Sequence, residues 1–191
     1  MSKCTTLVAL PEAIGALGGL KKLTLESSNL TVLPNAIGNL GALQVLNLRR
    51  CSRLTALPAT IEGLGALKDL TLQNCSRLAA LPDAISTLSA LEELYLIGCS
   101  SLTALPAEIG GLDALTMLNL SECVSLTALP AAIGELKALT TLDLTRCESL
   151  AELPAAIGGL GVQGRRDLRP MVPWCRPFPP RNRAAVLADG Q

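Results

Sequence analysis

Residues 67–91 read LKDLTLQNCSRLAALPDAISTLSAL, and the pattern of this stretch decides the fold. Written as a template it is L-x-x-L-x-L-x-x-C-x-x-L-x-x-L-P-x-x-I-x-x-L-x-x, a unit of 24 residues. A fixed period of this length predicts a solenoid, in which each unit forms one coil stacked on the next. The Leu-Pro step of the unit recurs along the chain at Leu10-Pro11, Leu33-Pro34, Leu57-Pro58, Leu81-Pro82, Leu105-Pro106, Leu129-Pro130 and Leu153-Pro154.

Each unit combines two different hydrophobic periods. The L-x-x-L-x-L part ends in an alternation of leucine and polar residues, which is typical of a strand with one buried face. The L-P-x-x-I-x-x-L part has a spacing of three, which predicts a short helix or 3-10 turn with the proline in its first turn. Stacking of identical coils makes the strands parallel neighbours in one sheet. The predicted strand segments are Leu20–Leu25, Leu43–Leu48, Leu67–Leu72, Leu91–Leu96, Leu115–Leu120 and Leu139–Leu144.

The L-x-x-L-x-L core resembles the leucine-rich repeat, over roughly residues 4–160. The resemblance implies an α/β solenoid, a leucine-rich-repeat horseshoe segment with parallel strands on the concave face and short helices or 3-10 turns on the convex face. The cysteine form of the unit looks like the repeats of plant-type nucleotide-binding disease-resistance proteins. It is also similar to intracellular repeats of the Ras-binding scaffold type, which generally carry Asn instead. No G-x-x-x-x-G-K-[ST] phosphate-binding motif occurs in the chain.

Two segments are predicted. Residues 1–160 form the array, with six strand-bearing repeats and a partial N-terminal coil that begins near Cys4 without a strand before it. Because an open solenoid end exposes leucines, either the chain is a piece of a longer array or another molecule covers this end. Residues 161–191 are rich in Pro and Arg, and this composition predicts disorder. The alternative is an irregular C-terminal cap that packs Trp174 and Phe178 on the last coil.

Six cysteines occupy the same position of successive units, so a stacked array places one thiol on each coil, about 4.8 Å apart. Parallel Cβ directions disfavour disulfides between neighbouring coils. A zinc site is not expected, since the chain has no His and no C-x-x-C pair. We expect a structural ladder of buried, reduced thiols bonded to loop carbonyls, as fits a reducing, cytoplasmic compartment. Its members are Cys4, Cys51, Cys75, Cys99, Cys123 and Cys147.

Catalysis is not expected. The absence of His removes the commonest general base and every Ser-His or Cys-His arrangement. Adjacent carboxylates such as Glu92 and Glu93 alternate direction on a strand, so they do not converge on one substrate. We therefore predict no catalytic residue, no metal and no cofactor. The chain also lacks a secretory signal peptide and an apolar run of membrane-spanning length, which predicts no membrane partner.

Variation between the units is concentrated on one predicted surface. Framework positions repeat almost unchanged, whereas the non-leucine strand positions and the two residues after them vary. This predicts a binding surface for a protein or peptide on the concave face, with Tyr95 and Ile97 exposed at its centre. The alternative is that side chains in contact only with water vary freely. The candidate binding residues are Val45, Asn47, Arg49, Asp69, Thr71, Gln73, Glu93, Tyr95, Ile97, Met117, Asn119 and Asp143.

The charges are unevenly distributed although they sum to zero. Residues 1–82 carry eight basic and four acidic side chains, and residues 83–160 carry two basic and ten acidic ones. The acidic half would repel phosphate, so no nucleic-acid partner is expected. Three hypotheses remain. The first is a binding module, the recognition part of an innate-immune-type or signalling scaffold. The second is an uncapped array that self-associates end to end. The third is a truncated gene product without a retained role.

Overall fold

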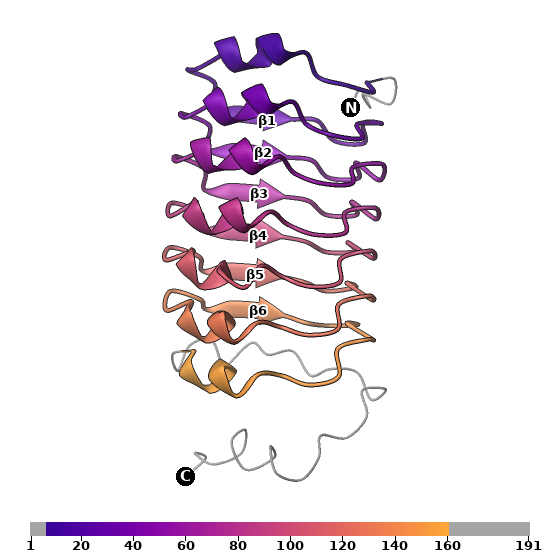
Figure 1. Cartoon of the computed structure of the whole chain (residues 1–191), viewed down its shortest axis with the longest axis vertical. Coiled ribbons are helices and arrows are strands. Elements are labelled where there is room, and N and C mark those ends of the chain that lie inside the picture. Colours follow the sequence, from indigo (N-terminus) through magenta and orange to yellow (C-terminus); the bar gives the residue numbers. More distant parts are fainter. Residues whose placement is uncertain (1–6, 161–191) are drawn as a thin grey trace.

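The computed structural model describes residues 7–160, which form a single stack of coils (Figure 1). Six coils have a three-residue strand on one side and a short 3-10 helix on the other, and one further described coil has only the helix. The strands are β1 (Lys22–Thr24), β2 (Val45–Asn47), β3 (Asp69–Thr71), β4 (Glu93–Tyr95), β5 (Met117–Asn119) and β6 (Thr141–Asp143). The helices are η1 (Glu12–Ala16), η2 (Asn35–Asn39), η3 (Ala59–Gly63), η4 (Asp83–Thr87), η5 (Ile109–Gly111), η6 (Ala131–Glu135) and η7 (Ala155–Gly159).

The strands form one sheet in the order β1-β2-β3-β4-β5-β6, and every neighbouring pair is parallel. Equivalent positions of successive units lie side by side, so that Leu46 is opposite Leu70 and Leu70 opposite Leu94. The predicted solenoid with parallel strands is confirmed. Regular pairing covers three residues of each predicted six-residue segment, because the chain turns into the coil corners on both sides of these three.

The prolines lie one position earlier than predicted. In six of the seven coils the proline immediately precedes the 3-10 helix, as its N-cap, with φ between −62° and −73° and ψ between 144° and 153°. Its carbonyl accepts the first turn's hydrogen bond, for example from the N–H of Ile37 to Pro34 at 3.1 Å. The helix therefore begins one residue after the proline, whose missing N–H is not needed there. In the fifth coil the regular helix begins later, at Ile109.

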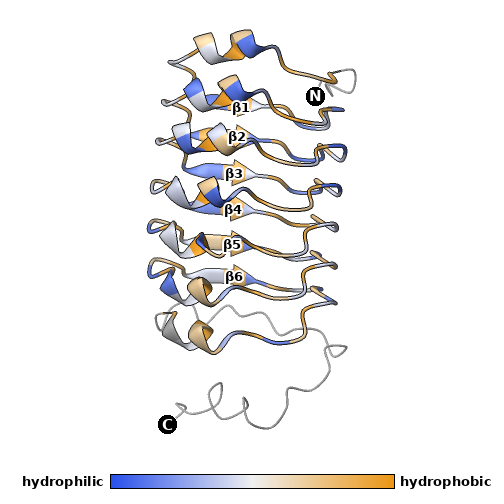
Figure 2. Cartoon of the chain, viewed as in Figure 1, coloured by the Kyte–Doolittle hydropathy of each residue, from blue (hydrophilic) through white to orange (hydrophobic). Residues whose placement is uncertain are grey.

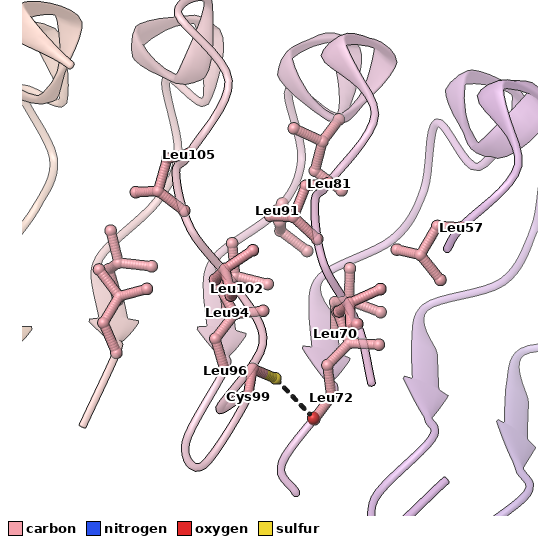
Figure 3. Packing of buried hydrophobic residues seen from close by; sticks show 14 of the residues in the cluster. Leu57, Leu70, Leu72, Leu81, Leu91, Leu94, Leu96, Cys99, Leu102 and Leu105 are labelled. Atoms are coloured by element: carbon pink, nitrogen blue, oxygen red, sulfur yellow. Dashed lines mark hydrogen bonds between the residues drawn. The ribbon is translucent and has the colours of Figure 1, made fainter. Parts of the chain in front are cut away.

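The core consists almost entirely of leucine and isoleucine from the repeat framework, and nearly all of these side chains are fully buried between Ile37 and Leu142. Leucines of one coil pack on the equivalent leucines of the next, as Leu94 and Leu96 do against Leu70 and Leu72 in Figure 3. Hydrophobic and hydrophilic residues alternate around each coil in Figure 2. Burial decreases toward the first coil, where Leu23 is half-buried, because only one described neighbouring coil covers it.

The cysteine thiols form a continuous row inside this core. Each thiol donates to the carbonyl of the last strand leucine in the preceding coil, as Cys99 does to Leu72 at 3.3 Å (Figure 3). The equivalent bonds of Cys51, Cys75, Cys123 and Cys147 are 3.1–3.2 Å long. Ser28, which replaces cysteine in the first full unit, is buried and lies 3.2 Å from the Cys51 sulfur. Cys4 and Cys175, and the predicted segment 161–191, lie outside the described residues.

Burial of the ladder predicts a loss of stability at alkaline pH. Burial raises the pKa of the Cys75 and Cys123 thiols from 9.0 to about 12, and it raises the pKa of Cys51 and Cys99 in the same direction. Unfolded thiols lose their protons above pH 9.0 while the folded ones keep them. The free energy of unfolding should therefore fall between about pH 9 and 12, by up to about 1.4 kcal/mol per pH unit for each thiol.

Urea unfolding at about pH 8 and about pH 10 checks this expectation. The Cys75→Ala/Cys123→Ala variant removes two of the four thiols with raised pKa, so its free energy of unfolding should fall less steeply over the same interval. An identical slope in the variant would show that other groups cause the alkaline loss.

Close stacking of the 3-10 helices predicts a second effect on stability. A Cβ atom added at Gly38 in η2 would lie 2.2 Å from the carbonyl oxygen of Thr60 in η3. We expect Gly38→Ala to lower the free energy of unfolding by about 1–3 kcal/mol, since two coils must move apart to admit the methyl group. Gly65→Ala is the matched control, because a Cβ atom added at Gly65 would have no other atom within 4 Å, and it should be close to neutral in the same urea titration. Equal effects of the two substitutions would contradict this account.

Candidate binding face

The outward side of the six-stranded sheet, with the second and third residues after each strand, is called the strand face here. The three-residue strands have their central leucine in the core and the two flanking side chains on the strand face. All twelve predicted binding residues lie on this face, and all twelve are half-buried. Strand pairing groups them into rows. One row contains Val45, Asp69, Glu93 and Met117, and the next contains Asn47, Thr71, Tyr95, Asn119 and Asp143.

Tyr95 lies near the middle of the strand face, between Thr71 and Asn119 on the neighbouring strands. Its hydroxyl donates a 2.9 Å hydrogen bond to the Glu93 carboxylate. Burial and the neighbouring carboxylates raise the pKa of Tyr95 to about 12, so the phenol is neutral at physiological pH. The sequence predicted an exposed ring, whereas Tyr95 and Ile97 are both half-buried. The reason is the close spacing of the coils, which lets adjacent side chains shield each other.

The apolar part of the face is small. Tyr95 belongs to β4, and Met117 belongs to the adjacent β5, with Ile97 two residues after Tyr95. Val45 is on β2 and is separated from Met117 by Asp69 and Glu93 in the same row. The apolar patch therefore consists of Tyr95, Ile97 and Met117, and its neighbours are polar.

In some coils the side chain of the second-row residue accepts a hydrogen bond from the backbone N–H two residues later, and in others it does not. The oxygens of Asn47, Asn119 and Asp143 each accept the N–H two residues later, at 2.9–3.0 Å. Thr71 instead donates to Asp69 at 2.9 Å, as Tyr95 does to Glu93. Among residues 7–160, no hydrogen bond is found for the backbone N–H groups of Gln73 and Ile97, which follow these two residues.

Several charges on the face are already paired. Lys68 contacts Glu92 at 2.7 Å, and Arg146 contacts Glu122 at 3.2 Å. Arg49 makes a weaker contact of 4.0 Å with Glu26, and its buried Nε has no hydrogen-bond partner in the described part of the chain. Exposed pairs of this kind add little stability. Other charges have no ion-pair partner within 4.0 Å among the described residues. They are the acidic Asp69, Glu93 and Asp143 and the basic Lys21, Lys22 and Arg50.

The third residue after each strand has a fixed backbone conformation, although the sequence pattern suggested a freely varying surface position. These residues all have positive φ: Ser27 60°, Arg50 60°, Asn74 61°, Gly98 69°, Glu122 62° and Arg146 59°. The left-handed region favours glycine and tolerates Asn, because other side chains crowd the backbone there. The presence of Asn74 and Gly98 in this column was the available signal.

No metal-binding cluster accompanies this surface in residues 7–160. No group of three or more His, Cys, Asp or Glu side chains there is placed to hold a metal ion. In the same range, no helix has the length and apolar character needed to cross a membrane. The groups that a ligand could contact on this surface are its side chains and its free backbone N–H groups.

The left-handed column predicts opposite effects of two substitutions. Arg50→Gly should raise the free energy of unfolding by about 0.5–1 kcal/mol, because glycine relieves the positive φ at an exposed position. Gly98→Ala should lower it, since the new Cβ would lie 2.5 Å from the Asn74 side-chain oxygen and would also be held at positive φ. Urea unfolding of both variants checks the prediction. If Arg50→Gly instead lowers the free energy of unfolding, the arginine side chain stabilises the fold by more than its positive φ destabilises it.

Comparisons with known proteins agree with the geometry. The family model described as leucine-rich repeat region matches residues 3–125. No curated protein sequence matches the chain. The solved leucine-rich repeat domain of the type III effector XopL is similar, at 29% sequence identity and a TM-score of 0.61, over 82% of this chain and 63% of that one.

A second solved structure shows the same fold. It is the Arabidopsis receptor kinase HAESA in complex with the peptide hormone IDA and the co-receptor SERK1. The identity is 21% and the TM-score 0.54, over 78% of this chain and 29% of that one. This chain thus spans less than two thirds of the length of either structure. The family match over more than half of the sequence, with the parallel six-stranded solenoid, shows that this protein belongs to the leucine-rich repeat family.

Proposed function

We propose that the protein is a non-catalytic interaction module that binds a protein or peptide on its strand face. The observation that carries this proposal is the arrangement of the varying residues. All twelve are collected on one side of the sheet, around an apolar patch of Tyr95, Ile97 and Met117 with unpaired charges nearby. An aromatic and two aliphatic side chains within a polar surround are typical of the centre of a protein interface.

The fold supports the proposal in a general way. HAESA, a protein of the same fold, has been solved with a bound peptide hormone, and parallel strands in a solenoid provide an extended surface in this family. The finer proposal is a recognition part of an innate-immune-type or signalling scaffold in the cytoplasm. It is motivated by the resemblance of the cysteine-type unit to plant-type disease-resistance repeats. Five buried thiols without disulfides are compatible with a reducing compartment.

End-to-end self-association is the second candidate function, and a specific observation favours it. In the first coil Leu17 is 51% exposed and Leu23 is half-buried, so apolar surface is available at one end of the described array. The basic half of one molecule could approach the acidic half of another. Such a head-to-tail contact would not close on itself. Molar mass that grows with protein concentration and falls with added salt in light scattering would support this function, and a constant monomer mass would exclude it.

The binding function predicts a loss of peptide recognition in a strand-face variant. Random peptides displayed on phage and selected on the full chain provide the probes. Tyr95→Ala/Ile97→Ser should lower the affinity for the selected peptides by at least about tenfold, because the binding free energy of an interface concentrates in a few central side chains. Lys137→Ala, on the side of the 3-10 helices, is the control and should bind them unchanged. Peptides that bind the double variant as well as the original chain would overturn the proposal.

A further inference from the structure

We infer that the strand face binds an extended peptide of uneven charge in one fixed orientation, with acidic residues over β1–β2 and basic residues over β3–β4. This inference rests on the proposed function and specifies the partner's chemistry. Three independent features of the face support it: the order of its unpaired charges, two free backbone donors, and the apolar patch beside them.

The first feature is the order of charges that no ion pair neutralises. The short pairs Lys68–Glu92 and Arg146–Glu122 leave other groups open to a ligand. On and beside β1 and β2 the open groups are basic, namely Lys21, Lys22, Arg49 and Arg50, with Arg49 held only by a 4.0 Å contact to Glu26. On β3 and β4 they are the carboxylates of Asp69 and Glu93, which are direct neighbours in the sheet. Opposite charges on a ligand would complement the two halves of this surface.

The second feature is the pair of free backbone donors at the third and fourth coils. Where Asn47, Asn119 or Asp143 is present, its side-chain oxygen accepts the N–H two residues later. Thr71 and Tyr95 direct their hydroxyls to carboxylates instead, so within the described chain the N–H groups of Gln73 and Ile97 bond no protein acceptor. A ligand oxygen can occupy the place that the Asn oxygen has in other coils. The nearby Asp69 and Glu93 disfavour an anion, which makes a neutral peptide carbonyl the matching group.

The third feature is the position of the apolar patch relative to these donors. Ile97 supplies both a free N–H and an aliphatic side chain, and Tyr95 lies on the strand just before it. A carbonyl bonded here would bring a neighbouring apolar side chain of the peptide onto Tyr95, Ile97 and Met117. The ligand would therefore be anchored by its main chain and one apolar residue, and its direction along the array would be set by charge.

Coil spacing fixes the separation of the two charged parts of the ligand. From the middle of β1–β2 to the middle of β3–β4 there are two coil spacings, about 10 Å in all. An extended peptide covers this distance with about three residues. The matching sequence is an acidic pair and a basic pair separated by one residue, so that the centres of the two pairs are three residues apart. One apolar residue follows the basic pair, because the apolar patch lies on and after β4 and on β5.

Fluorescence anisotropy with two synthetic peptides tests the inference on the full chain at low ionic strength. The block peptide is Asp-Asp-Ser-Lys-Lys-Leu, and the mixed peptide has the same composition with alternating charges, Asp-Lys-Ser-Asp-Lys-Leu. We expect the block peptide to bind at least about tenfold more tightly, and added salt to reduce this preference. Equal affinities, or no detectable binding of either peptide up to millimolar concentration, would overturn the inference.

Variants identify the groups responsible. Asp69→Asn/Glu93→Gln removes the acidic half while keeping oxygen acceptors for the Thr71 and Tyr95 hydroxyls, and it should abolish the preference for the block peptide. Arg49→Gln/Arg50→Gln should do the same at the other end. Thr71→Asn makes the third coil like the second, so the new amide oxygen should accept the Gln73 N–H. This should lower the affinity for both peptides about threefold or more. Lys137→Gln and Glu135→Gln, on the helix side, are the charge-neutralising controls and should change nothing.

Orientation is measured directly with a benzophenone residue at either end of the block peptide. Crosslinks from the acidic end should map to residues 20–50, and those from the basic end, which carries the leucine, to residues 91–122. Identical maps from both ends would overturn the inference. If phage-selected peptides need Tyr95 and Ile97 but show no charge order, the proposed function stands and this inference fails. If they do not need these residues, the proposed function itself fails, and dimerisation detected by light scattering would identify a second copy as the occupant of the face.

Discussion

The distance between adjacent backbones in the parallel sheet is the constraint on which the rest of this structure depends. Parallel strands hydrogen-bond at about 4.8 Å, and every coil must follow its neighbour at that spacing all the way around. Leucines then pack on equivalent leucines, and thiols align with the carbonyls of the preceding coil. The same spacing leaves no room for a side chain where Gly38 approaches Thr60. A repeat of nearly constant length is the sequence-level consequence.

This constraint divides each unit into residues that pack between the coils and residues that lie on the surface of the strand face. Leucine, isoleucine, cysteine and proline positions face the core or the coil corners, so a change in one coil disturbs the packing of two others. The strand-face side chains contact their counterparts on adjacent strands and groups of their own coil, but they do not enter the core. These positions can vary at little cost to folding, and stacked repeats present them together as one extended surface.

The strand face is nevertheless more constrained than a freely varying surface. Asn47, Asn119 and Asp143 bond the backbone of their own coil, and Arg50 and Glu122 accept a positive φ to close the turn after the strand. Two central coils lack the side-chain oxygen that would complete this pattern. Thr71 and Tyr95 stand in these coils where other coils have an Asn or Asp that accepts the backbone N–H two residues later. Departures of this kind are expected at functional positions.

By itself the sequence determined the class of fold, the order and parallel direction of the strands, the leucine core and the one-thiol-per-coil arrangement. A period of 24 residues with fixed apolar offsets admits one way of burying so many leucines, and local pattern and global packing agree at nearly every position. The side of the sheet on which Val45, Tyr95 and Asp143 lie followed from strand alternation alone. These features depend on spacing along the chain, which a sequence displays directly.

Only the tertiary structure decided the details that depend on contacts between coils. It set the half-burial of Tyr95, the ion pairs that neutralise Glu92 and Glu122, and, within the described chain, the free N–H groups of Gln73 and Ile97. It also showed that the third residue after each strand is left-handed. The physical reason is that each of these properties belongs to a pair of residues about 24 positions apart or to a backbone angle. A one-dimensional pattern specifies which residues become neighbours, but distances and directions at the contact arise only when the coils are stacked.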